Sequence, residues 1–125
     1  MLMSDLLLLG DQFTYHLYRD AVDMRKSFDG LCALVRNRLD MSVDHGKIFI
    51  FLNKRRSHLK VLLHEDGGFS MFYRRLHEGS FELPDVDMTK PSVPISPLVM
   101  MSLLKGLKLL RNKNDDSYQH NGLRC

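Results

Sequence analysis

The sequence predicts a small α+β domain, in which an antiparallel meander of three or four strands carries one amphipathic helix and is followed by a short C-terminal helix. Three short apolar stretches separated by turns predict the meander, and an apolar repeat of 3.6 residues after the first strand predicts the helix. A chain of 125 residues, 44% hydrophobic and 26% charged, has the size and composition of one domain. The expected divisions are a variable N-terminal extension at 1–12, the core domain at 13–84, a proline-rich arm at 85–97, the C-terminal helix at 98–111 and a mobile tail at 112–125.

The first strand and the main helix are predicted in the first third of the chain. Residues 13–18 are rich in aromatic side chains and alternate between two faces, which is typical of a strand. Apolar residues then recur with the helical period from Met24 to Leu39, and Asp23 is the expected N-cap.

Two adjacent cations, Arg25 and Lys26, fall in the first turn of this predicted helix. They meet the positive end of the helix dipole there, so we expect an anion or Asp29 to offset them. The residues alone leave open whether Asp23 and Asp29 are structural or functional.

Three consecutive strands are predicted at residues 47–53, 59–65 and 69–76. The first is apolar on both faces, which is typical of a central strand. The connection at residues 53–57 has the length of a hairpin and an almost entirely cationic tip, and residues 66–68 form a second tight turn.

The segment after the meander is rich in proline. Residues 81–83 are expected to form a short fourth strand, and four prolines between residues 84 and 97 indicate a linker or an extended arm. Ser96 and Pro97 are suited to begin a helix, and Gly106 is suited to end it.

The cysteines and the apolar N-terminal run indicate in which cellular compartment the protein is expected. Cys32 and Cys125 form neither a disulfide framework nor a metal-ligand pattern, which favours a reducing compartment. Residues 6–9 are too few for a membrane span and follow no basic segment. We expect a cytoplasmic protein without membrane contact.

Positive charge is concentrated in the meander, although the net charge of the whole chain is only +3. Cations on a hairpin tip can reach phosphates that a flat sheet cannot, so we predict phosphate contacts with DNA. Charge that protects a sheet edge from aggregation is the alternative interpretation of the tip. No base-reading motif is present, so the predicted contacts are not sequence-specific. The predicted DNA-binding residues are Arg25, Lys26, Arg55, Arg56, Lys60, Arg74 and Arg75.

Catalytic motifs are not found in the sequence. There is no nucleophile elbow, no phosphate-binding glycine loop and no histidine or cysteine spacing typical of zinc, so we expect neither an enzyme nor a cofactor. A metal-dependent nuclease built on Asp23 or Asp29 is a third hypothesis, but two-metal phosphoryl transfer needs converging carboxylates, and no spacing in the sequence suggests them.

Three blocks of the sequence resemble a known family. They are residues 23–31, then residues 48–60 with their apolar strand and Arg55-Arg56, then residues 68–81 with Tyr73-Arg74-Arg75-Leu76 and Glu78-Gly79. The chain resembles the small accessory protein of the insertion sequence 66 family, the Orf2 or TnpB product, which is unrelated to the RNA-guided nuclease also called TnpB. His64 departs from this pattern, because family members often have Trp there.

The resemblance implies a non-catalytic accessory protein of DNA transposition that assists a separate transposase. DNA is then the expected partner, together with the transposase and a sister accessory protein of the same element. The alternative is a protein interaction module that binds the transposase or the sister protein without contacting DNA, through the exposed sheet face or the C-terminal helix.

Overall fold

The computed structural model describes residues 13–44, 46–65, 67–83 and 89–105. The expected extension at 1–12, part of the arm, and the chain after residue 105 lie outside the described residues. In chain order the elements are β1 (Thr14–Tyr18), α2 (Phe28–Arg38), β2 (Lys47–Leu52), β3 (His58–Glu65), β4 (Gly68–Arg75), β5 (Ser92–Ile95) and α3 (Pro97–Lys105).

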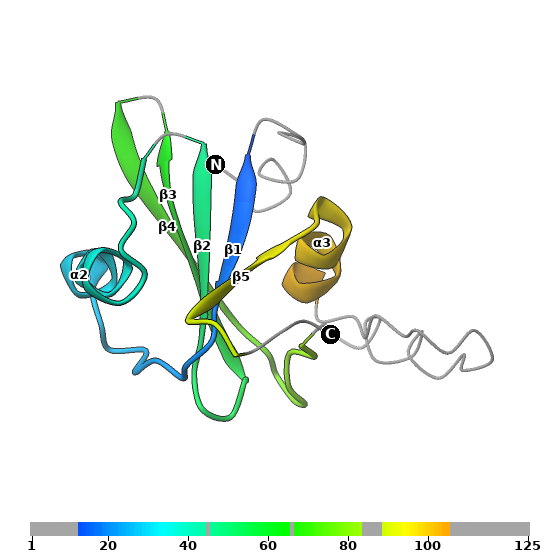
Figure 1. The fold of residues 1–125 in the computed structure, drawn as a ribbon. Helices are drawn as coiled ribbons and strands as arrows, with labels where there is room; N and C mark the ends of the chain where they lie inside the picture. Colours follow the sequence, from blue (N-terminus) through cyan, green and yellow to red (C-terminus); the bar gives the residue numbers. More distant parts are fainter. Residues whose placement is uncertain (1–12, 45, 66, 84–88, 106–125) are drawn as a thin grey trace.

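The described strands form one mixed sheet in the order β4-β3-β2-β1-β5. The α+β class and the antiparallel meander of β2, β3 and β4 are confirmed. The prediction of a purely antiparallel sheet is wrong, because β1 pairs with β2 in parallel. The segment that contains α2 carries the chain back along the sheet, and a parallel pair requires such a long connection (Figure 1).

The proline-rich segment contributes a strand, which the sequence did not predict. Residues 81–83 are not a strand, and Ser92–Ile95 forms β5 instead, antiparallel to β1 with Val93 opposite Leu17. Pro94 is compatible with this position because, among the described strands, β5 pairs with β1 alone, and proline is tolerated on an edge strand.

Helix α2 begins at Phe28, four residues after the predicted start. Asp23 closes a separate turn, in which its Oδ1 accepts the backbone N–H of Arg25 at 2.9 Å. Arg25 and Lys26 therefore lie in the turn before the helix, and the expectation that they occupy its first turn is wrong. A short aspartate side chain competes with helix formation at such positions by bonding to nearby backbone.

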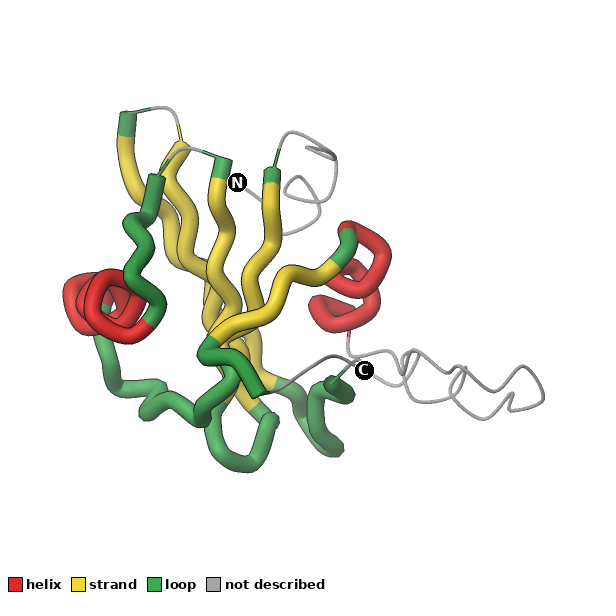
Figure 2. The backbone as a smooth tube through the Cα atoms, viewed as in Figure 1, coloured by secondary structure: helices red, strands yellow, loops and turns green. Residues whose placement is uncertain are grey.

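The two helices pack on opposite faces of the sheet (Figures 1 and 2). Odd-numbered residues of β1 and β3 and even-numbered residues of β2 and β4 point to the α3 face, where aliphatic side chains pack with Phe81, Met100 and Leu103. On the α2 face, Leu31 and Val35 of the helix pack on Phe49 and Phe51 of β2. Both cores are fully buried at their centres, so the sheet is a rigid platform for its exposed ends.

Candidate nucleic-acid interface

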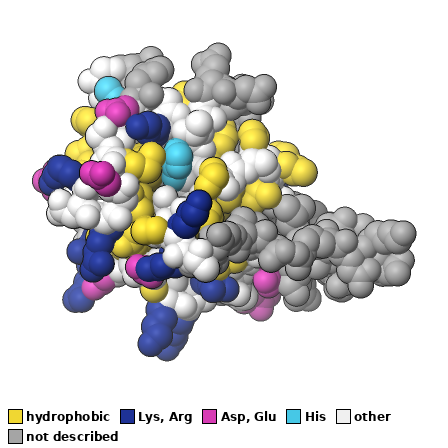
Figure 3. All heavy atoms as spheres, in the orientation of Figure 1, with side chains coloured by type: hydrophobic (Ala, Val, Ile, Leu, Met, Phe, Trp, Pro, Cys, Tyr) yellow, Lys and Arg dark blue, Asp and Glu magenta, His cyan; other side chains and the backbone are white. Residues whose placement is uncertain are grey.

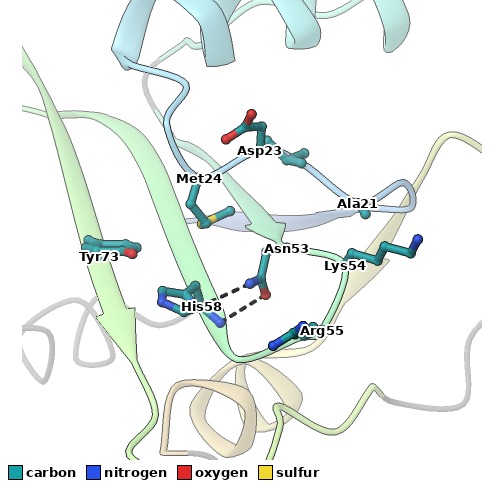
Figure 4. A pocket seen from close by; sticks show the side chains of 9 residues that line it. Ala21, Asp23, Met24, Asn53, Lys54, Arg55, His58 and Tyr73 are labelled. Atoms are coloured by element: carbon teal, nitrogen blue, oxygen red, sulfur yellow. Dashed lines mark hydrogen bonds between the residues drawn. The ribbon is translucent and has the colours of Figure 1, made fainter.

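The β2–β3 hairpin has a tip of fixed shape. The Oδ1 atom of Asn53 accepts the backbone N–H groups of Ser57 and His58 at 2.9 and 3.0 Å. Its Nδ2 atom donates to Ser57 Oγ at 3.1 Å. The same atom lies 3.1 Å from His58 Nδ1, and Figure 4 shows how Asn53 faces His58. An asparagine that bonds across a turn replaces part of the backbone pairing there, so this one side chain closes the connection.

The three residues at the tip, Lys54, Arg55 and Arg56, are exposed. The φ angle of Arg56 is 58°, which is a left-handed backbone conformation that residues other than glycine rarely adopt. Its backbone is bonded on both sides, because its N–H donates to Asn53 O at 3.0 Å and its carbonyl accepts the N–H of Phe81 at 2.6 Å. Phe81 is 1% exposed in the α3-face core, so the core fixes the backbone under the tip.

Arg25 projects from the turn before α2, with its side chain 91% exposed. Its guanidinium forms an ion pair with Asp23, with Nη2 2.7 Å from Oδ2 and Nε at 3.1 Å from both carboxylate oxygens. The side-chain hydrogen bonds from Arg25 lower the pKa of Asp23 to about 2, and the backbone N–H of Arg25 adds to the effect. Asp23 is therefore the anion beside Arg25 that the sequence led us to expect, although the pair lies outside the helix.

Lys60 is buried, in contrast to the other predicted phosphate ligands. It is 8% exposed, and its Nζ donates to the carbonyl oxygens of Met24 at 2.7 Å and Lys26 at 2.8 Å. The ammonium also lies 5.4 Å from the ring centroid of Tyr73. Lys60 therefore connects β3 to the turn that carries Arg25, and the structure places it under the surface as a structural link.

Arg74 and Arg75 point to opposite faces of β4. Arg75 is exposed on the α2 face, opposite His58, whereas Arg74 is half-buried on the α3 face, opposite Leu59. The Nε atom of Arg74 is buried and has no hydrogen-bond partner among the described residues. The two side chains cannot contact the same phosphate from one surface.

The structure brings the exposed cations of the predicted set, together with Lys54, to one end of the sheet, where β2 ends and β3 begins. We call this group the basic end. In Figure 3, Lys and Arg side chains gather along the lower edge, where Figure 1 shows the β2–β3 hairpin and the segment between β1 and α2. The exposed acids Glu78 and Glu82 follow Arg75 in the chain. The basic end consists of Arg25, Lys26, Lys54, Arg55, Arg56 and Arg75.

A groove of about 440 Å³ lies within the basic end (Figure 4). Residues 21–24 form one wall, and the hairpin with Asn53, Lys54 and Arg55 forms the other. The rings of His58 and Tyr73 complete the lining and stack with centroids 5.8 Å apart and planes at 26°. Cations, aromatic rings and a shaped cavity therefore occur at one place.

Metal-ligating side chains do not form a cluster in the part of the chain that the structure describes, where no three His, Cys, Asp or Glu residues come together in a group that could hold an ion. Among the described residues, neither helix has the length and apolar composition needed to cross a membrane.

Comparison with known proteins places the chain in a family. A family model described as IS66 Orf2 like protein matches residues 13–114, which is more than half of the chain. The chain belongs to this family. The resemblance in the three sequence blocks is thereby confirmed, and membership in the IS66 Orf2-like family implies an accessory role in transposition.

One curated relative of this IS66 Orf2-like protein comes from Sinorhizobium fredii (strain NBRC 101917 / NGR234). This relative, named uncharacterized protein y4hO, is 32% identical over 85 residues, which are 68% of the present chain and 72% of the relative. No solved structure matches the chain.

Sequence reasoning missed four residues of this site, Asn53, Lys54, His58 and Tyr73. An asparagine directly before a cationic turn is a signal for turn closure that was available in the sequence. The alternation of side chains along a strand also requires adjacent Arg74 and Arg75 to face opposite sides. The stacking of His58 on Tyr73 depends on the strand register, which the sequence does not specify.

Proposed function

We propose that this IS66 Orf2-like protein is a non-catalytic accessory factor of transposition that holds DNA by its basic end and so assists a separate transposase. The observation that carries the proposal is the collection of six exposed cations at one end of the sheet, on three segments that lie apart in the sequence. Cations grouped in this way neutralise neighbouring phosphates and release their counterions, which is the main source of non-specific DNA affinity.

The construction of the tip supports this proposal over simple edge protection. Edge protection needs charge on the exposed edge of a strand, and β2 and β3 are both interior strands of the sheet. The hairpin backbone is fixed by Asn53 and by the bond from Phe81, so its three cations project from a rigid base. A fixed base lowers the entropy lost on binding.

The predicted contact set changes with the structure. Arg25, Lys26, Arg55, Arg56 and Arg75 remain in it, and Lys54 joins them because it is exposed at the tip. Lys60 and Arg74 leave the set, the first because two carbonyl groups bind it and the second because it faces the opposite side of β4.

The test is binding of the full-length protein to a labelled duplex that carries an element end, and to a scrambled duplex, between 50 and 200 mM salt. We expect both duplexes to bind with similar affinity. In Arg55→Gln with Arg56→Gln, the slope of log K against log salt should become shallower by about 1.8, which corresponds to two lost phosphate contacts.

A matched control is Lys47→Gln, because Lys47 begins β2 at the end of the sheet away from the hairpin. It removes one charge, as Arg55→Gln does, but should leave the slope unchanged. If Lys47→Gln and Arg55→Gln changed the slope equally, DNA binding would depend on net charge alone. That result would contradict the proposal that DNA binds at the basic end. Absence of binding at 50 mM salt would contradict the whole proposal.

A second candidate function is protein binding, favoured by exposed apolar side chains on strand β4. Phe69 is 53% exposed and Met71 is 38% exposed, on an edge strand of the described sheet. In this alternative the β4 surface binds the transposase or the sister accessory protein. Phe69→Ser with Met71→Ser would then abolish co-purification of the transposase and leave duplex binding unchanged.

A further inference from the structure

The groove at the basic end has the features of a site for a single flat ring. Its volume of about 440 Å³ is in the range of small-molecule sites. Tyr73 lines it and is 54% exposed, so part of the aromatic ring is open to a ligand. Phe69 is equally exposed but packs on Phe28 and His64 outside the groove, whereas Tyr73 lies in the groove lining.

The second ring of the groove is held in one orientation. Asn53 directs its Oδ1 to two backbone N–H groups, so its Nδ2–H group must face His58 Nδ1. Ser57 Oγ lies 2.7 Å from the same Nδ1 atom, so two side chains of the hairpin hold this side of the ring. His58 is thereby a pre-oriented stacking partner of Tyr73.

Charge lies directly beside the rings. Lys54 and Arg55 line the same groove and belong to the hairpin tip, so a phosphate bound by them would share the groove with a base on the aromatic surface. The opposite wall contains Val22 and Met24, whose side chains are apolar. An aromatic surface with cations on one rim is the arrangement with which proteins bind unpaired bases and their backbone.

We propose that this groove binds one unpaired nucleobase of single-stranded or locally opened DNA, stacked on the exposed part of the Tyr73 ring that His58 supports from its other side, with the adjoining phosphate on Lys54 and Arg55. This inference rests on the proposed function and adds the form of DNA that the basic end prefers. A base inside a duplex is stacked between its neighbours and cannot present its face to a protein ring, so the groove selects for unpaired DNA.

The experiment compares binding of the full-length protein to a 12-nucleotide strand and to the duplex of the same sequence, at one salt concentration. We expect Tyr73→Leu to weaken binding of the strand about tenfold and binding of the duplex less than twofold, because a stacked base contributes about 1–3 kcal/mol. Tyr73→Phe keeps the ring and should bind the strand like the unaltered protein.

The matched control is Phe69→Leu, which removes an equally exposed ring from the same face of β4, four residues away and outside the groove. It should change binding of the strand less than twofold. A strand carrying 5-iodouracil, which crosslinks on irradiation to an aromatic ring stacked on it, should mark Tyr73 or His58 in a peptide map.

The outcomes separate this inference from the proposed function. If the protein binds the duplex and Tyr73→Leu does not weaken binding of the single strand, the proposed base site is overturned. The proposal that the basic end binds DNA would then still stand. Equal losses in Tyr73→Leu and Phe69→Leu would assign the effect to the β4 surface as a whole and also overturn the base site. Absence of binding to both forms of DNA would overturn the basic end itself.

Discussion

The two faces of the sheet are packed in different ways. The α3 face is closed, with Phe81, Met100 and Leu103 at 1% exposure or less over aliphatic strand residues. The α2 face has a smaller buried cluster, includes the polar side chains of Lys60 and His58, and leaves the rings on β4 exposed. The comparison teaches that stability is concentrated on one face, whereas groups able to bind a ligand are concentrated on the other.

The largest expected effect is on the closed face. Phe81→Ala should lower the free energy of unfolding by about 3–5 kcal/mol, because it leaves a cavity in the core. Phe69→Ala, on the open face, should lower it by less than about 1 kcal/mol, because half of that ring is already in solvent. Urea unfolding measures both, and similar losses for the two would contradict the difference between the faces.

A smaller effect is expected where a charge is buried on the open face. Lys60→Met should lower the free energy of unfolding by about 2 kcal/mol, because the carbonyl groups of Met24 and Lys26 lose their donor. It should leave the salt dependence of DNA binding unchanged. Lys54→Met, at the exposed tip, should show the reverse: little change in urea unfolding and a slope shallower by about 0.9. A shallower slope in Lys60→Met would return Lys60 to the DNA contacts.

Substitutions of the adjacent residues Arg74 and Arg75 test the difference between the two faces of the sheet. Arg74→Met should raise the free energy of unfolding by about 1 kcal/mol, because it removes a buried donor without a described partner from the closed face. Arg75→Met should leave unfolding within about 0.5 kcal/mol of the unaltered protein and make the DNA salt slope shallower by about 0.9. A clear loss of stability in Arg74→Met would reveal a partner for its guanidinium.

The smallest effect expected is a pH dependence from His16 on the open face. Burial, and then the charge of Lys47, lower the pKa of His16 from its ordinary value of 6.5. The unfolded chain therefore takes up this proton at a higher pH than the folded protein, so stability is complete above about pH 6.5 and falls as the pH is lowered.

Thermal unfolding at pH 7.5 and pH 5.5 measures this dependence. His16→Gln should reduce the difference in Tm between the two pH values, whereas His77→Gln, at an exposed position after β4, should not. An undiminished difference in His16→Gln would assign the pH dependence to other groups.

The meander and both helices could be predicted from sequence because their signals are local. The predicted strands at 47–53, 59–65 and 69–76 agree with β2, β3 and β4 to within one residue at every end. The start of α2 was wrong because Asp23 forms a turn that competes with the helix. Strand β5 was missed because prolines argue against a strand unless its edge position is known.

The parallel pairing of β1 and β2 had a signal that was not used. A strand, a helix and a second strand in succession are typical of a β-α-β unit, which places the strands in parallel. Of the candidate site, the cationic tip was predictable because three cations follow one another. The burial of Lys60 was not, because it depends on where the turn at Met24 settles on the sheet.

The position of β1 has a consequence for how the protein is made. This interior strand lies near the start of the described chain, and its second neighbour, β5, lies near the end. During translation the open edge of β1 therefore cannot be paired until residues 92–95 leave the ribosome, and α3 follows only after them. The sheet is completed late, by contacts between residues far apart in the sequence, and such contacts slow folding and expose a strand edge to other nascent chains while they form.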